Sequence, residues 1–100
     1  MQDDAIPGGI WVFQAPLKGR FAGGLFSTRA EAEAWIERHA LSGVLTLYPL
    51  DEGVYNWAIQ KGLFRPKKPH ESEAPFIGGF TTASQPHYHY EGGREGEDEA

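Results

Sequence analysis

The stretch that decides the fold is Leu41-Ser-Gly-Val-Leu-Thr-Leu-Tyr-Pro-Leu-Asp-Glu-Gly-Val-Tyr-Asn-Trp-Ala-Ile59. Residues 44–49 are rich in β-branched and large apolar side chains, which is typical of a strand. Pro49 cannot donate a backbone hydrogen bond, so the strand is expected to end there. Asp51 is then the expected N-cap of a second helix, which Gly62 closes. Most of the large apolar residues have to pack around these pieces.

The N-terminal part of the chain predicts a β-hairpin. Ile10-Trp-Val-Phe-Gln-Ala15 is β-branched and aromatic, and its consecutive apolar residues indicate a strand buried on both faces or central in the sheet. A turn at residues 16–19 leads into a second strand, Phe21-Ala-Gly-Gly-Leu-Phe26. Gly23-Gly24 inside that strand indicates a bulge, and a ligand that approaches the backbone closely is the alternative.

A helix is predicted to follow the hairpin. With Thr28 as N-cap, Glu31 stands at the third helical position and completes a capping box. One apolar stripe follows at helical spacing: Ala32, Trp35, Ile36 and His39. Arg29 and Glu33 are four residues apart and are expected to pair on the solvent-facing side. Gly43 is expected to take the left-handed conformation that ends the helix.

The C-terminal third has weaker signals. Residues 64–75 contain three prolines among polar residues and predict a loop that is mobile or functional. Residues 76–81 and 86–90 predict two further strands, the second with strict alternation. From Glu91 onward the chain is mostly glycine and acid, which predicts disorder.

These elements together predict a small α+β domain. The order of strands and helices favours a mostly antiparallel sheet of about four or five strands, with two helices packed on one face. The expected organisation is a flexible lead-in over residues 1–9, a single domain over residues 10–90 and a disordered acidic tail over residues 91–100.

Composition narrows the class of protein. The chain has 100 residues, no cysteine and a net charge of −5. Five of its 14 acids lie in residues 91–100, so the body is almost neutral and has no broad attraction for nucleic acid. The N-terminus has no signal-peptide pattern, and no apolar run approaches the roughly 20 residues that span a bilayer. We therefore expect a cytoplasmic protein that binds neither nucleic acid nor membrane.

The clearest candidate site for chemistry is His87-Tyr-His-Tyr-Glu91. On a strand, His87, His89 and Glu91 share one face, and two imidazoles with a carboxylate are suited to zinc, iron or nickel. His70 or His39 is a possible fourth ligand. The alternative is an edge strand with solvated histidines and half-buried tyrosines.

Signals for an enzyme are weak elsewhere in the sequence. No Gly-x-Ser-x-Gly elbow and no phosphate-binding glycine loop occurs. Asp51 with Glu52 is a candidate acid–base pair, although helix capping explains Asp51 more simply. The chain is therefore more consistent with a binding protein than with an enzyme, and no cofactor is expected apart from the possible transition metal.

Several segments resemble a family of small uncharacterised bacterial proteins. The matching segments are Trp11-Val-Phe13, Gly24-Leu-Phe-Ser27, Ala32-Glu-Ala-Trp-Ile36, Leu41-Ser-Gly-Val-Leu-Thr46, Tyr48-Pro-Leu-Asp51, Gly53-Val-Tyr-Asn-Trp-Ala58, Phe76-Ile77 and His87-Tyr-His-Tyr-Glu91. The family has no established activity. Some small bacterial proteins of similar build act as immunity partners for secreted toxins, an analogy at the level of fold alone.

The expected function is the binding of another protein, possible partners being the toxins that immunity proteins neutralise. Aromatic residues on a short helix beside a proline-rich loop can form a contact surface. The predicted surface comprises Tyr55, Trp57, Phe64, Arg65, Lys67 and Lys68. The core is the competing location for Tyr55 and Trp57. A metal-binding protein or metalloenzyme that uses His87, His89 and Glu91 is the second hypothesis, and a homodimer formed through a sheet edge is the third.

Overall fold

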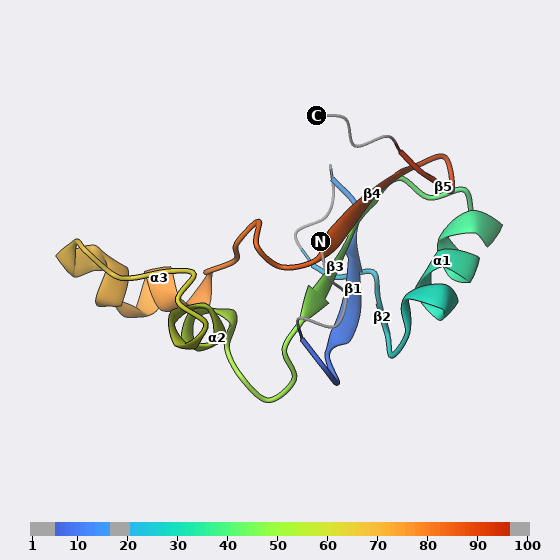
Figure 1. Cartoon of the computed structure of the whole chain (residues 1–100). Helices are drawn as coiled ribbons and strands as arrows, with labels where there is room; N and C mark the ends of the chain where they lie inside the picture. Colours follow the sequence, from blue (N-terminus) through green and yellow to red (C-terminus); the bar gives the residue numbers. More distant parts are fainter. Residues whose placement is uncertain (1–5, 17–20, 97–100) are drawn as a thin grey trace.

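The computed structural model describes residues 6–16 and 21–96, which form an elongated α+β molecule of 44 × 28 × 28 Å (Figure 1). A single antiparallel sheet has the strand order β2-β1-β3-β4-β5. The strands are β1 (Ile10–Gln14), β2 (Gly24–Phe26), β3 (Gly43–Tyr48), β4 (His87–Glu91) and β5 (Arg94–Glu95). The helices are α1 (Arg29–Arg38), α2 (Val54–Gln60), the 3₁₀ turn η2 (Pro69–Ser72) and α3 (Ala74–Gly78). The predicted fold class is confirmed.

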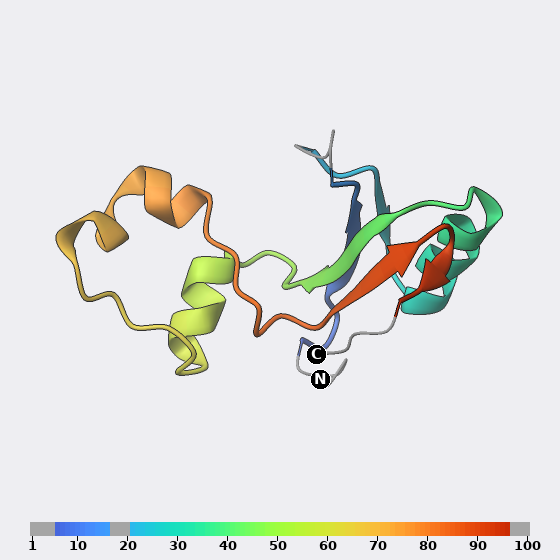
Figure 2. The ribbon, with the colours of Figure 1, turned by 90° about the horizontal axis from the view of Figure 1, so that it is seen from above.

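The strand register creates one apolar face. Trp11 lies opposite Leu47, and Phe13 lies opposite Leu45, so these side chains share a face. Leu45 lies opposite Tyr88 of β4, which extends the same face across the sheet. Ala32 and Ile36 of α1 join this buried cluster, as do three residues of α2: Val54, Trp57 and Ala58. Figures 1 and 2 show α1 beside one end of the sheet, and α2 with α3 beyond the other end.

Helix α1 begins as predicted and ends differently. The Thr28 hydroxyl accepts a hydrogen bond from the Glu31 amide at 3.1 Å, so the N-cap is confirmed. The prediction that Gly43 ends the helix is wrong, because Ala40 takes the left-handed conformation, with φ 52°, and Gly43 begins β3. A Cβ atom at Gly43 would lie 2.5 Å from the carbonyl oxygen of Gln14. Close packing of two strands therefore explains this glycine.

Helix α2 has a different start from the predicted one. Its N-cap is Gly53, without a side-chain hydrogen bond, and Asp51 lies in the preceding turn with a left-handed φ of 63°. Asp51 as helix cap is therefore wrong, because the chain needs a left-handed turn there before it can enter the helix, and Asp tolerates that conformation. Gly62 closes the helix as predicted, with φ 76°.

The predicted strand at residues 76–81 is wrong, and the predicted loop at residues 64–75 is confirmed only as far as residue 68. The chain forms η2 and then α3, in which Pro75 occupies the first turn, where its fixed φ favours a helix. Phe76 and Phe80 are four residues apart, and their ring centroids are 5.8 Å apart. Both rings pack against Tyr55 of α2. The Pro and Phe spacing therefore produces a helical turn that closes a second, smaller aromatic cluster.

Both chain ends carry more structure than expected. Ile6, within the predicted flexible lead-in, is buried in the core. Gly92 and Gly93 have positive φ and turn the chain into β5, so the prediction of disorder is wrong for residues 91–96. Residues 1–5 and 97–100 lie outside the described part. Within residues 6–16 and 21–96, no helix has the length and apolar character needed to cross a bilayer.

Candidate functional site

The predicted contact residues of α2 are interior side chains. Tyr55 is 8% exposed and Trp57 is 4% exposed, so neither offers area to a partner. The Tyr55 hydroxyl donates a hydrogen bond to the carbonyl oxygen of Glu71 at 2.8 Å, which ties α2 to η2. Tyr55 and Trp57 therefore act as packing residues beneath the segment that follows α2. The exposed residues of this region are the neighbours of the half-buried Phe64 in the sequence.

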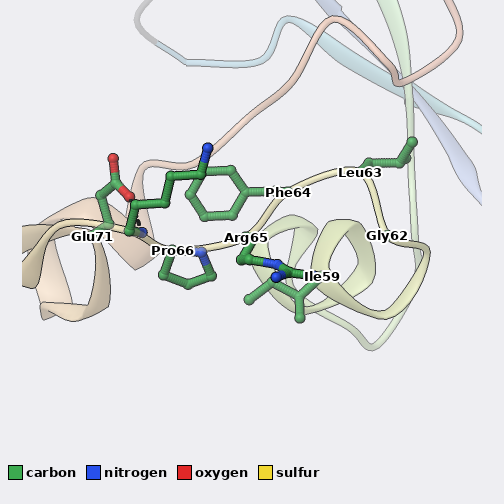
Figure 3. A pocket seen from close by; sticks show the side chains of 8 residues that line it. Ile59, Gly62, Leu63, Phe64, Arg65, Pro66 and Glu71 are labelled. Atoms are coloured by element: carbon green, nitrogen blue, oxygen red, sulfur yellow. Dashed lines mark hydrogen bonds between the residues drawn. The ribbon is translucent and has the colours of Figure 1, made fainter.

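An open groove lies along that segment and has a volume of about 580 Å³. Its lining residues are Ile59, Gly62, Leu63, Phe64, Arg65, Pro66, Lys67 and Glu71. Figure 3 shows Arg65 beside Ile59 near one end, Glu71 at the other, and Phe64 and Pro66 between them. Three of the predicted contact residues, Phe64, Arg65 and Lys67, thus line one groove, and Lys68 follows directly in the chain.

Phe64, which lines the groove, belongs to a packed aromatic cluster. The Phe64 ring stacks on Phe76 with centroids 5.8 Å apart and 28° between the planes. The ring centroid of Phe80 lies 4.7 Å from that of Phe64, and the ring centroid of Tyr55 lies 5.9 Å from that of Phe64. Ring pairs at these separations are mutually stabilising. Phe64 is therefore held in place, so the groove is largely formed before any partner binds.

The lining of the groove is positively charged, because it contains two cationic side chains, Arg65 and Lys67, and one carboxylate, Glu71. The Glu71 carboxylate accepts hydrogen bonds from the backbone amides of Lys67, at 2.7 Å, and Lys68, at 3.3 Å. These two bonds lower the pKa of Glu71 below its ordinary value. Within the part of the chain that the structure describes, neither Arg65 nor Lys67 forms a salt bridge. Their cationic groups are available to an external anion.

This arrangement predicts a pH response of the groove. Since the pKa of Glu71 is lowered in the folded state, its carboxylate stabilises the loop at neutral pH, and the contribution is lost as the pH falls through the lowered value. An NMR titration should find the Glu71 pKa below 4.5, and the protection factor of the Lys67 amide against hydrogen exchange should fall in acid. In Glu71→Gln, this acid-dependent loss of protection should disappear. A Glu71 pKa at or above 4.5 would contradict this account.

The predicted metal ligands lie on the other part of the molecule, on β4. The rings of His87 and His89 are neighbours, with centroids 5.4 Å apart. Glu91 lies opposite Arg94 in the β4–β5 pair. Among residues 6–16 and 21–96, no three His, Cys, Asp or Glu side chains gather closely enough to hold a metal ion. The structure thus brings the two imidazoles together without the carboxylate.

The other candidate residues are dispersed. His39 is the C-cap of α1, and His70 packs its ring on Phe76, so neither approaches β4 to form a group of three ligands. Asp51 and Glu52 are exposed in the turn before α2. Gly24 lies in β2 opposite Phe13, and a Cβ atom there would crowd the Phe26 ring, so packing accounts for this glycine.

Comparison with known proteins provides a family assignment. A family model described as a domain of unknown function (DUF7710) matches residues 10–96. The chain belongs to this family. No curated protein and no solved structure matches it. The DUF7710 assignment agrees with the resemblance to an uncharacterised family.

The DUF7710 match covers every strand and helix, including the groove and the His87–His89 pair. It includes the β5 strand, which the sequence patterns had placed in a disordered tail. Sequence reasoning also missed Ile59, Leu63 and Glu71 as groove residues. None of the three carries a local sequence signal, since their place in the groove depends on how α2 and η2 come together.

Proposed function

We propose that this DUF7710 domain is a protein-binding module whose groove takes an acidic segment with apolar side chains from a partner protein. One observation carries the proposal: the groove combines exposed apolar side chains with unpaired cations. Leu63 is 47% exposed and Ile59 is 38% exposed, both beside Arg65 and Lys67. An acidic segment would pair with the cations while its apolar side chains cover Leu63 and Ile59.

The fixed position of Phe64 in the groove supports this role. Phe64 is fixed by Phe76 and Phe80, so little conformational entropy is lost when a partner binds. Arg65 offers a planar group that can pair with a carboxylate through two hydrogen bonds. The proposal involves recognition alone, with no reaction and no cofactor.

The test places a photoreactive side chain in the groove. Leu63→p-benzoylphenylalanine, expressed in the source cells and irradiated, should crosslink to a partner whose attached peptide is identified by mass spectrometry. We expect a peptide that contains Asp or Glu next to apolar residues. Arg65→Glu with Lys67→Glu, added to the same probe, should reduce the crosslinked product by about tenfold or more, because like charges then face each other.

The matched control reverses two distant cations. Arg38→Glu with Arg94→Glu changes the net charge by the same amount, and both residues are exposed on α1 and β5, away from the groove. The control variant should give the same yield of crosslinked product as the Leu63 probe without charge reversal. Equal crosslinking by both double variants, or a captured peptide that lacks acids, would overturn the proposal.

A narrower form of the proposal makes the partner a secreted toxin and the domain its immunity protein. It rests on similarity of build alone. We place the binding in the cytoplasm, since a chain without cysteine suits a reducing compartment. A homodimer through a sheet edge is less well supported, because the outer strands β2 and β5 have three and two residues and therefore few unpaired backbone groups.

A further inference from the structure

The His87–His89 pair occupies the face of the sheet opposite the core. His87 pairs with Thr46 and His89 with Val44, whereas the core residue Leu45 pairs with Tyr88 between them. His87 is half-buried and His89 is exposed. Two imidazoles two residues apart on a rigid strand are thus presented together on a surface that the groove does not use.

A backbone hydrogen bond sets the tautomer of His87. Its Nδ1 lies 2.8 Å from the carbonyl oxygen of Gln85. A carbonyl oxygen can only accept, so Nδ1 carries the proton and, in the neutral ring, Nε2 keeps its lone pair. Gln85 is itself fully buried and held by Leu47 and Thr82, so its carbonyl is a fixed anchor. Orientation of a histidine by a carbonyl on its second nitrogen is the usual arrangement around protein-bound metals.

The separation of the two rings matches a shared metal ion. With a metal–nitrogen bond of about 2.0–2.1 Å, a metal lies about 3.2 Å from the centroid of each ring that binds it. At a tetrahedral angle of about 109°, the two centroids would then be about 5.2 Å apart. The observed distance is 5.4 Å, with 81° between the ring planes. The two rings are therefore spaced as two ligands of one metal ion would be.

We propose that His87 and His89 form a two-histidine chelate for a divalent transition-metal ion, with solvent or an anion in the remaining positions. An open cavity of about 300 Å³ adjoins His87 and provides space for such a co-ligand. Thr46 and Tyr48 line it. Burial raises the pKa of the Tyr48 phenol, whose hydroxyl is a hydrogen-bond donor among the residues around this cavity.

The chemistry of the ligands indicates which ions bind. Imidazole suits Zn²⁺, Ni²⁺ and Cu²⁺, and of the divalent ions from Mn²⁺ to Zn²⁺, Cu²⁺ binds most tightly to a given nitrogen site. Because no third side chain completes the set among the described residues, the site is open and exchangeable. It differs from the predicted His-His-Glu set in that Glu91 has no part in it.

The test is a Cu²⁺ titration of the whole chain, without an affinity tag, in competition with a chelator of known affinity. We expect one tight Cu²⁺ per chain and an electron paramagnetic resonance spectrum with coupling to two imidazole nitrogens. His89→Asn should weaken binding by about tenfold or more, because the second bond of a chelate forms at high effective concentration. His89 is exposed, so this variant should keep the fold.

Two controls make the result decisive. His39→Asn removes an exposed histidine at the end of α1 and should leave the Cu²⁺ affinity unchanged. His87→Asn should weaken binding as His89→Asn does. Equal affinities of the parent chain and His89→Asn, or equal losses in His39→Asn and His89→Asn, would overturn the proposal. The groove variant Arg65→Glu with Lys67→Glu should bind Cu²⁺ normally, which separates this site from the proposed partner surface.

Discussion

Replacing Leu45 with Ala is expected to lower the free energy of unfolding by about 2–5 kcal/mol. Leu45 is fully buried on the central strand β3, between Phe13 of β1 and Tyr88 of β4. Truncation removes apolar contacts and leaves a cavity that two neighbouring strands prevent from collapsing. Because a domain of this size is stable by only about 5–15 kcal/mol, this loss is a large share of the total.

Urea denaturation followed by tryptophan fluorescence measures this effect. The midpoint should fall with little change in slope, since the same surface is exposed on unfolding. Leu25→Ala is the matched control, because Leu25 also lies in the sheet but is 65% exposed. It should change the free energy by no more than about 0.5 kcal/mol. Similar losses in both variants would show that Leu45 does not occupy a packed core.

Replacing Gln85 with Met is expected to cost about 2–4 kcal/mol, although the side-chain volume is nearly conserved. Gln85 is fully buried, and its amide nitrogen donates to the Leu47 carbonyl at 3.1 Å. Its amide oxygen accepts from the Thr82 amide at 3.0 Å. Methionine would leave both backbone groups without these partners, and each orphaned buried group costs about 1–3 kcal/mol.

Gln60→Met makes the same chemical change on an exposed residue at the end of α2. It should leave stability within about 0.5 kcal/mol of the parent chain. Gln85→Met should also speed hydrogen exchange of the Thr82 amide, which a general loss of packing would not do selectively. An unchanged free energy of unfolding in Gln85→Met would show that the two hydrogen bonds add no net stability.

The candidate sites could be predicted only in part. The basic segment around Arg65 and the His87–His89 pair are visible as residue types at a given spacing. The position of Phe64 in the groove depends on Phe76 of α3 and on Phe80, which follows that helix. Both reach Phe64 only after the chain has turned back on itself. Contacts between distant segments leave no local pattern, so neither the groove nor the aromatic cluster that holds Phe64 could be derived from the sequence.

The structure places Tyr55 and Trp57, two of the predicted contact residues, in the interior. Tyr55 and Trp57 follow each other closely on a short helix whose apolar surface wraps more than half of it, so the pattern did not show which side meets the core. The structure buries both, because α2 is covered by the sheet end and by the η2–α3 segment together. The partner surface that we propose therefore excludes both and consists of exposed side chains around them.

The sequence by itself determined the antiparallel α+β class, the Thr28 cap and the end of β3 at Pro49, because these depend on local backbone preference and on apolar spacing. Only the tertiary structure decided the environment of Arg29. The expected bond to Glu33 is present, at 2.9 Å, but the guanidinium also lies 3.4 Å above the Tyr88 ring and bonds Glu95 at 3.0 Å. Tyr88 and Glu95 follow Arg29 by 59 and 66 positions in the sequence. They contact it because the sheet brings β4 and β5 close to α1, a placement that no local preference encodes.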